Sequence, residues 1–186
     1  MYFTGDWLED NYIMSDILDQ IEFYSGTERK KLLKKNGVKH PKNAGSMLWG
    51  TTWRGYLSPT KMRTKAPFQG LYYTKVHDLY PDLDDIFNEF SSYYFKDFEF
   101  DQVQMNKNYP IPRHKDSKNI GDSVLCCFGD YTGGETCVEY ENETKIYKPN
   151  ENPVIFNGSQ YYHYINKFEG DRYSLVFFRN NRKKSI

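Results

Sequence analysis

Hydrophobic residues in the first half of the chain follow a helical period in two segments. Within residues 11–23, Ile13, Ile17, Leu18 and Ile21 fall at helical spacing. This spacing predicts a helix over 11–23, with Ser15 and Asp16 as candidates for its cap. Residues 81–95 (PDLDDIFNEFSSYYF) form the strongest helical pattern, because a proline suits the first turn, acids crowd the N-terminal end and the apolar residues share one face. A shorter helix is expected over 28–35.

From residue 98 onward the pattern changes to short apolar or alternating runs, which favours β-strands. The runs are FEFDQVQMN, SVLCCFGDY, GETCVEY, TKIYKP, NPVIFNG, YYHYIN and RYSLVFFRN. Turn residues separate them at hairpin-like intervals, which is typical of an antiparallel sandwich or a small barrel. Residues 36–70 are rich in Gly, Pro, Thr and Ser, and we expect loops with short strands there. We therefore predict one α+β domain over 1–186, in which a helical and basic-loop support region (1–97) precedes a β core (98–180).

The composition indicates a folded domain. The chain has 186 residues, of which 38% are hydrophobic and 18% aromatic, so one core is expected and disorder is not. No apolar run approaches the ~20 residues that a membrane span needs, and no signal-peptide pattern follows Met1. The three cysteines form neither a disulfide framework nor a CxxC zinc pattern. We expect a protein of a reducing compartment, the cytoplasm or the nucleus, with no membrane partner.

The charges are segregated along the chain, although the formal net charge is zero. Residues 1–28 contain seven acids and no base, whereas residues 29–77 contain twelve bases and no acid. The basic segment is either a solvated face that pairs with the acidic segments, or a track for a polyanion such as nucleic acid. Aromatic residues are interleaved with its bases, as stacking on nucleic-acid bases would require: Trp49, Trp53, Tyr56, Phe68, Tyr72 and Tyr73. The segment 29–77 therefore favours nucleic acid as the partner.

Two histidines and an aspartate in the second half have the spacing of a metal site. His114 and Asp116 are two residues apart, so both face one side of an extended strand, and His163 comes from a later strand. Two imidazoles and one carboxylate on one face of a metal leave positions open, as in non-haem Fe(II) oxygenases. Arg172 follows in the next strand, where its planar fork suits a carboxylate, and Ser174 shares its face.

Each of these residues also has an ordinary structural explanation. A His-x-Asp sequence is common by chance, a histidine is often a hydrogen-bonded core residue, and an arginine in a strand is usually a surface charge. The conjunction within short strands is more specific, and we interpret it as a site for iron and 2-oxoglutarate. His40 and His77 are left as surface or substrate-side residues, and the cysteines as core.

Residues 101–178 resemble the double-stranded β-helix (jelly-roll, cupin-like) core of the Fe(II)/2-oxoglutarate-dependent dioxygenases. The resemblance is carried by the HxD…H and Arg-x-Ser pattern quoted above. It implies that the HxD…H residues bind iron and that Arg172 and Ser174 grip the distal carboxylate of 2-oxoglutarate. In that family, polar residues on the strand before the HxD motif commonly hold the cosubstrate. Asn106 and Gln104 alternate onto one face there, with Tyr109 a weaker candidate.

The string HKDSKNIGDSVLCCFGDYTGGE is similar to the TET/JBP-type enzymes, which oxidise the methyl group of pyrimidines in nucleic acid. The chain lacks the cysteine-rich zinc region of the animal members. The resemblance implies an oxidoreductase that hydroxylates a base methyl group of 5-methylcytosine or thymine type, a form of DNA modification. Its cosubstrates would be 2-oxoglutarate, which is decarboxylated to succinate, and O2, with ascorbate as the in vitro reductant.

A base in duplex DNA would have to be flipped out of the stack to reach such a site. The substrate-binding candidates are a stacking aromatic residue (Trp53 or Tyr161, with Tyr162 as an alternative), Arg54 of the basic segment, and Asn119, whose amide could read a base edge.

Two other functions remain open from the sequence. The first is a hydroxylase of the same fold that acts on a protein side chain, as prolyl hydroxylases do, or on a small molecule. The second is a non-catalytic binding module with a degenerate site, against which the intact triad argues. The sequence leaves open whether the target is DNA, RNA, a nucleotide or a protein. It also leaves open the extent of oxidation, the oligomeric state and the source organism.

Overall fold

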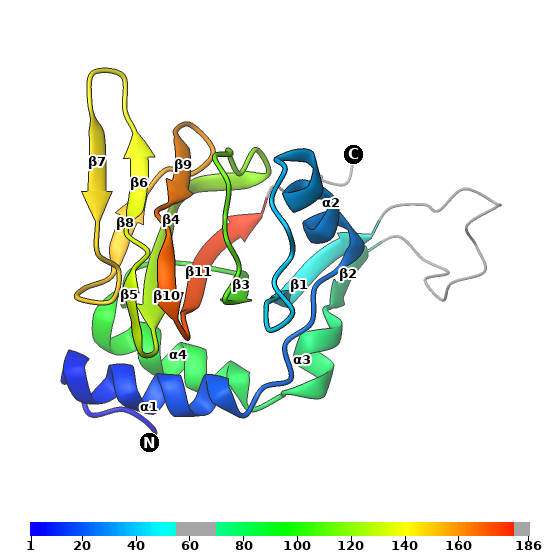
Figure 1. Ribbon diagram of the computed structural model, residues 1–186. Helices are drawn as coiled ribbons and strands as arrows, with labels where there is room; N and C mark the ends of the chain where they lie inside the picture. Colours follow the sequence, from blue (N-terminus) through cyan, green and yellow to red (C-terminus); the bar gives the residue numbers. More distant parts are fainter. Residues whose placement is uncertain (55–69, 181–186) are drawn as a thin grey trace, which may run out of the picture.

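The computed structural model describes residues 1–54 and 70–180, without the side chains of residues 27, 28, 53 and 54 (Figure 1). The helices are α1 (Trp7–Asp19), α2 (Thr27–Lys35), α3 (Lys75–Leu79) and α4 (Leu83–Tyr94). The strands are β1 (Gly45–Arg54), β2 (Gly70–Tyr73), β3 (Gln102–Lys107), β4 (Asn119–Phe128), β5 (Tyr131–Gly133), β6 (Thr136–Glu139), β7 (Thr144–Tyr147), β8 (Val154–Phe156), β9 (Tyr162–Ile165), β10 (Phe168–Gly170) and β11 (Tyr173–Asn180).

The described strands form antiparallel sheets. The largest has the order β2-β1-β3-β11-β4-β8, and the smaller ones are β7-β6-β9 and β10-β5. In Figure 1 the β7-β6-β9 sheet stands at the left of the molecule, and α2 lies at the right, beside β1. The mostly antiparallel β architecture predicted for the second half is confirmed.

The strands of the large sheet are not confined to the second half of the chain. Over 45–54 the sequence suggested loops with short strands, but β1 is ten residues long and pairs with β3 from Gly45↔Lys107 to Gly50↔Gln102. The β layer therefore begins at Gly45 rather than at residue 98. The glycines and threonines of this segment read as loop, but pairing with β3 and β2 overrides that local preference.

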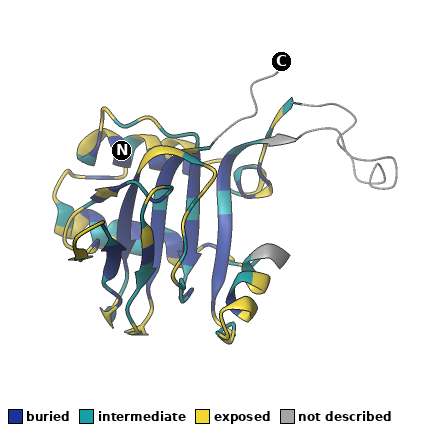
Figure 2. Cartoon of the chain, turned by 90° about the horizontal axis from the view of Figure 1, so that it is seen from above, coloured by how far each residue is buried: buried dark blue, intermediate teal, exposed yellow. Residues whose placement is uncertain are grey.

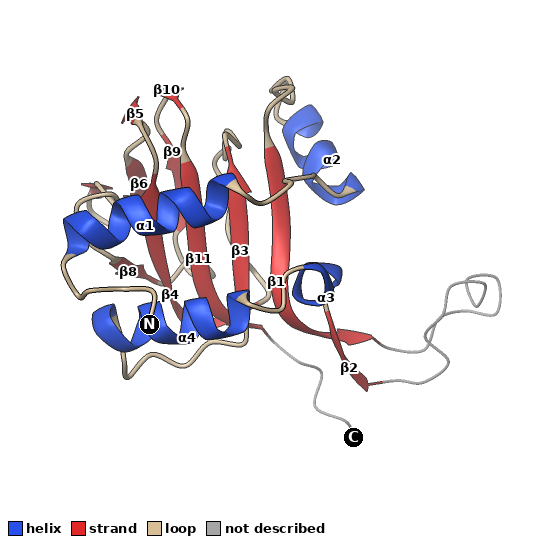
Figure 3. Ribbon diagram, turned by 90° about the horizontal axis from the view of Figure 1, so that it is seen from below, coloured by secondary structure: helices blue, strands red, loops and turns tan. Residues whose placement is uncertain are grey.

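Helices α1 and α4 lie across one face of the large sheet, as Figure 3 shows from below. The central strands therefore bury both faces, and Figure 2 shows them as dark ribbons. On β3, Val103 and Met105 belong to the core beneath the helices, whereas Gln104 and Asn106 line a cavity on the other face. Strict alternation along each strand thus separates an apolar core from a polar cavity.

The predicted helices exist, with differences at their ends. Helix α1 begins at Trp7, before the predicted start, because Asp6 caps it by accepting hydrogen bonds from Leu8 N and Glu9 N. Ser15 and Asp16, proposed as caps, lie inside α1. Helices α2 and α4 match their predicted segments closely, while α3 and β10 are too short to show a sequence period. No helix in the described ranges is long and apolar enough to cross a membrane.

Phe90 of α4 is the centre of the core between the helices and the sheet. Its side chain is fully buried. Its ring contacts the rings of Phe3, Trp7, Tyr94, Phe95, Phe128 and Phe177, at centroid distances of 4.8–6.4 Å. These rings come from the N-terminal segment, both long helices and two strands, so Phe90 joins both layers of the fold.

We expect Phe90→Ala to lower the free energy of unfolding by about 3–5 kcal/mol, because it removes a buried ring and leaves a cavity. Urea denaturation followed by circular dichroism measures this. The control is Leu8→Ala in α1, where the leucine is 66% exposed and the change should stay within about 0.5 kcal/mol. A loss below about 1 kcal/mol for Phe90→Ala would contradict this description of the core.

Candidate metal and cosubstrate site

Backbone pairing brings the HxD segment to β9. His114 and His163 form an isolated antiparallel bridge, in which each backbone N–H donates to the carbonyl oxygen of the other residue at 3.0 Å. Two residues later, Asp116 N donates to Gly158 O at 2.8 Å. The segment that carries His114 and Asp116 is thus tied to both ends of the loop that leads into β9.

The three predicted metal ligands lie together. One ligand atom from each of His114, Asp116 and His163 lies within 4.8 Å of the others. Each Nε2 of the histidines is 3.3 Å from a different oxygen of the Asp116 carboxylate. His163 is 7% exposed, and the other two are half-buried, so the cluster sits at the inner end of an opening.

The hydrogen bonds of the histidines fix which nitrogen faces the cluster. Nδ1 of His114 lies 2.7 Å from Pro112 O, and Nδ1 of His163 lies 3.1 Å from Tyr161 O. A carbonyl oxygen only accepts, so each Nδ1 carries the proton and donates. In the neutral ring the Nε2 lone pair then points at Asp116, which itself offers only lone pairs.

Such a convergence of lone pairs is relieved by a cation, which is either a metal ion or a proton on an imidazole Nε2 that donates to the carboxylate. Burial alone would raise the pKa of Asp116, but hydrogen bonds and charge from His114 and His163 outweigh it and hold that pKa well below its usual range. The carboxylate is therefore ionised at neutral pH. Two imidazoles oriented through Nδ1 and one carboxylate form a donor set that fits a divalent transition metal such as iron.

Gly158 leaves room for the carboxylate. A Cβ atom at this position would lie 3.1 Å from Asp116 Oδ2 and 3.2 Å from His163 Cε1. These contacts are tighter than ordinary van der Waals contact, so a side chain here would press on both ligands. The sequence shows only an Asn-Gly turn at this point, and Gly158 was not singled out there.

Arg172 is a buried cation that has no anionic partner among the described residues. It is 2% exposed, one Nη2 hydrogen bond runs to Cys127 Sγ at 3.1 Å, and Nε finds no partner among the described residues. The rings of Tyr131 and Phe168 lie 5.5 and 5.7 Å from the guanidinium carbon. Burial raises the pKa of the Cys127 thiol, so this thiol stays neutral and does not balance the charge. A buried guanidinium of this kind is costly unless a ligand anion joins it.

Close contacts explain both glycines of the TGGE string. Gly134 has φ +71°, and a Cβ there would lie 3.0 Å from Arg172 Nε. Gly133 has φ +73°, and a Cβ there would lie 2.4 Å from Lys167 O. Both positions combine a left-handed backbone with close approach, which only glycine tolerates without strain. The two glycines therefore have a physical role, because they let this turn pass close to Arg172 and Lys167.

A row of hydrogen bonds crosses the cavity-facing side of the large sheet. Arg29 Nη2 donates to Gln104 Oε1 at 2.6 Å, and Gln104 Nε2 donates to Ser46 Oγ at 3.1 Å. Ser46 Oγ donates to Asn106 Oδ1 at 2.6 Å, and Asn106 Nδ2 donates to Ser174 Oγ at 3.1 Å. Every donor in this row points toward Ser174, so the Ser174 hydroxyl keeps its own proton for an acceptor in the cavity.

The cavity between the two larger sheets contains all the predicted metal and cosubstrate residues except Tyr109, the weaker candidate, which does not line it. It is lined by Arg29, Gln104, Asn106, Ile111, His114, Asp116, Asn119, Leu125, Thr136, Phe156, His163, Tyr164, Ile165, Arg172, Ser174, Val176 and Phe178. Its empty volume is about 660 Å³, including the open mouth. Thr136 adds a buried hydroxyl that has no partner among the described residues.

The predicted substrate residues have different positions. Asn119 lines the cavity, and its Nδ2 donates to Ser123 Oγ at 3.3 Å. The ring of Tyr161 instead packs against Tyr140, at a centroid distance of 4.6 Å, and does not line the cavity. The side chains of Trp53 and Arg54 lie outside the described residues.

Arg29 and Thr136 are cavity residues that the sequence analysis did not single out. In the sequence, Arg29 was one of many bases in 29–77. It reaches the cavity only because α2 lies beside β1 and β3. Thr136 follows directly after the TGGE string, so its position near Arg172 was the available signal.

Comparisons with known proteins agree with this fold. No protein-family model and no curated protein matches the sequence. Among solved structures, NgTET1 in complex with 5mC DNA is similar, with a TM-score of 0.51 and 20% identity over 84% of this chain and 69% of that chain. A 2OG-Fe(II) oxygenase family oxidoreductase from Burkholderia pseudomallei (TM-score 0.41, 20% identity) covers 62% of this chain and 66% of its own. A prolyl-4-hydroxylase from Pseudomonas putida (TM-score 0.48, 14% identity) covers 97% and 89%. The likeness to NgTET1, at 20% identity, is a likeness of fold.

Proposed function

We propose that the protein is an Fe(II)- and 2-oxoglutarate-dependent dioxygenase. The observation that carries the proposal is the placement of three converging lone-pair ligands in the same cavity as a buried arginine that has no anionic partner in the described part of the chain. A divalent cation would balance the lone pairs of the three ligands, and a dicarboxylate would balance the charge of the arginine. On this proposal, the facing sheets are the two halves of a double-stranded β-helix.

In this proposal His114, Asp116 and His163 would hold the iron. Arg172 and Ser174 bind the distal carboxylate of 2-oxoglutarate, with the Ser174 proton held toward it by Asn106. Asn106 and Gln104 are the polar floor beneath the cosubstrate, and Thr136 offers one more hydroxyl. The sheets fix the position of each of these groups before the ligands bind, and such fixed positions favour catalysis.

Bound iron and 2-oxoglutarate supply the oxidising chemistry, in which O2 and 2-oxoglutarate convert a substrate C–H to C–OH and release succinate and CO2. The chain's residues bind, orient and exclude water. Leu125, Phe156, Val176 and Phe178 contribute apolar walls that limit solvent around the reacting groups.

For the substrate we propose the methyl group of a pyrimidine base in nucleic acid. The TET-like string in the sequence supports this, as does the likeness to a structure solved with 5mC DNA. Asn119 lies in the same cavity as the proposed metal ligands, where an amide could read a base edge. Trp53 remains a proposal for base stacking, and Arg54 for phosphate contact. We favour Asn119 over Tyr161 as a substrate residue, because Asn119 lines the cavity and Tyr161 does not.

We expect Asp116→Ala to abolish binding of Fe(II) or its substitute Mn(II), because it removes the only anionic ligand of the cluster. Calorimetric titration of the metal under anaerobic conditions measures this. Asp122→Ala is the matched control, since this exposed aspartate precedes the buried part of β4 and lies outside the cavity. Unchanged metal affinity in Asp116→Ala would show that the metal assignment is wrong.

We expect Arg172→Ala to raise the 2-oxoglutarate concentration for half-maximal turnover about 10- to 100-fold, the value of a charged hydrogen-bonded pair. Metal binding should remain, because Arg172 is not a ligand. Arg179→Ala provides the comparison, since Arg179 is exposed and pairs with Glu99 at the surface. A 2-oxoglutarate requirement that does not move would remove Arg172 from the cosubstrate site.

The function is tested by incubating the iron-loaded protein with 2-oxoglutarate, ascorbate and a duplex that contains 5-methylcytosine and thymine. We expect succinate, together with 5-hydroxymethylcytosine or 5-hydroxymethyluracil in the nucleosides by mass spectrometry. The Asp116→Ala protein and a reaction without 2-oxoglutarate should give neither. Succinate formation that nucleic acid does not stimulate would keep the dioxygenase and reject the proposed substrate.

A further inference from the structure

A second hollow adjoins the cavity on the side of α2 and β1. It is lined by Tyr24, Gly26, Arg29, Ser46, Met47, Leu48, Thr52, Thr74, Lys75, Gln104 and Lys118. Arg29 and Gln104 line both this hollow and the cavity, so the two spaces meet at that pair. We call this hollow the basic groove.

The charges of the basic groove are all positive. Arg29, Lys75 and Lys118 line it, and no carboxylate is among its described lining residues. Within the described parts of the chain, none of these three side chains has an ion pair, whereas Lys107, Lys145 and Lys148 elsewhere each pair with an acid. An unbalanced line of cations beside a cavity attracts a polyanion.

Arg29 is held in place at the junction. Its Nη2 donates to Gln104 Oε1 at 2.6 Å, and its carbonyl oxygen accepts from the buried Tyr109 hydroxyl at 2.8 Å. Gln104 is itself anchored, because its Nε2 also donates to Met47 O at 2.6 Å. The remaining N–H groups of the guanidinium have no acceptor in the described residues, so they are available to an anion at the mouth of the cavity.

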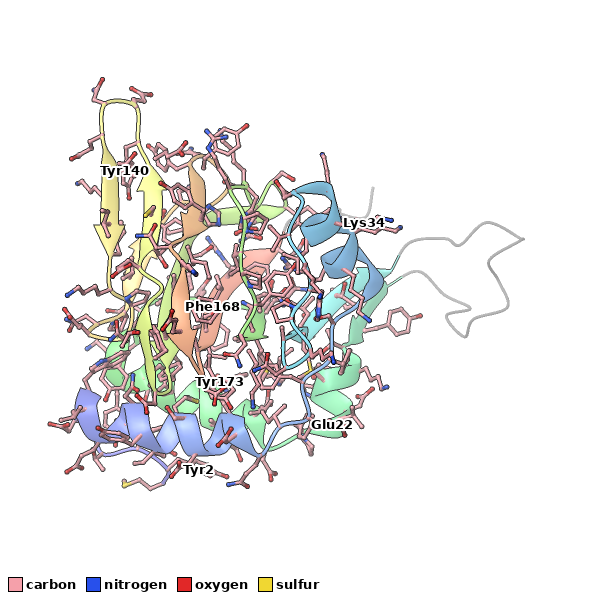
Figure 4. All side chains as sticks on the ribbon, in the orientation of Figure 1. Tyr2, Glu22, Lys34, Tyr140, Phe168 and Tyr173 are labelled. Atoms are coloured by element: carbon pink, nitrogen blue, oxygen red, sulfur yellow. The ribbon has the colours of Figure 1, made fainter. Side chains whose placement is uncertain are left out.

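The groove also offers an aromatic surface. Tyr24 is 40% exposed, and Lys75 Nζ lies 5.6 Å from the centre of its ring. A ring face beside a lysine can stack on a base while the ammonium contacts the neighbouring phosphate. In Figure 4, Lys34 extends from the outer side of α2, away from the strands.

We propose that the basic groove binds the sugar-phosphate backbone of a nucleic-acid strand, with Arg29 on the phosphate next to the nucleotide that enters the cavity. Lys75 and Lys118 contact neighbouring phosphates, and Tyr24 stacks on an adjacent base. Spaced cations and an aromatic ring favour this occupant over an acidic peptide. The inference rests on the proposed function and names the surface that the substrate would use.

The test measures binding of a fluorescein-labelled oligonucleotide with one 5-methylcytosine, by fluorescence polarisation. The protein is loaded with Fe(II) and 2-oxoglutarate and kept anaerobic, so that no turnover occurs. We expect Lys75→Ala and Lys118→Ala each to weaken binding about fivefold at about 0.1 M salt. Each should also reduce the slope of log K against log salt by about 0.7–0.9. Both lysines are exposed, so these variants should fold.

Lys96→Ala is the matched control, because this exposed lysine follows α4 and does not line the groove. It should bind like the unmodified protein. Wild-type affinity and salt slope in both groove variants would overturn the proposal, as would equal competition by a polyglutamate peptide.

The outcomes also separate the groove from the proposed function. Groove-dependent binding without any hydroxymethylated base would retain the groove and reject the proposed reaction. Formation of the hydroxymethylated base with unaltered binding in both variants would retain the reaction and reject the groove.

Discussion

The backbone bridge between His114 and His163 is the constraint on which the site depends. The HxD segment leaves β3 at the large sheet, and β9 belongs to the other sheet, so nothing in either sheet alone brings the two imidazoles together. The paired N–H···O bonds, both 3.0 Å, join the two layers at the cavity. Gly158 then lets Asp116 approach the same point. The main-chain pairing thus helps to set the geometry of the ligands.

Two parts of the cavity can be balanced by a bound ion of opposite charge. Lone pairs meet around Asp116, and a guanidinium lies buried at Arg172. The buried guanidinium lowers the stability of the ligand-free fold, and a bound anion relieves this cost. The aromatic core around Phe90, on the far side of the sheet, supplies apolar burial that offsets this cost. Binding of metal and carboxylate should then stabilise the fold by mass action.

The sequence was informative where chemistry and local spacing coincide. His114, Asp116, His163, Arg172 and Ser174 could be assigned to one face because i and i+2 alternate along strands, and the structure brings them into one cavity. The long apolar pattern of α4 was equally readable. Features that depend on tertiary contacts could not be predicted from the sequence. Strand β1 depends on pairing with β3, and Arg29 reaches the site only because α2 lies beside β3. The start of α1 depended on recognising Asp6 as a cap.

The row of hydrogen bonds from Arg29 to Ser174 has a single direction. Because each donor points the same way, the four hydrogen bonds form a chain of aligned dipoles with its positive end at Ser174. Rotation of the Asn106 amide by half a turn would set donor against donor at Ser46, and the Ser174 hydroxyl would then donate its proton to Asn106 Oδ1 instead of to the cavity. Replacement of Asn106 by aspartate would likewise draw the Ser174 proton to the new carboxylate. The preference of the cavity for an acceptor at Ser174 therefore depends on the orientation of one amide group.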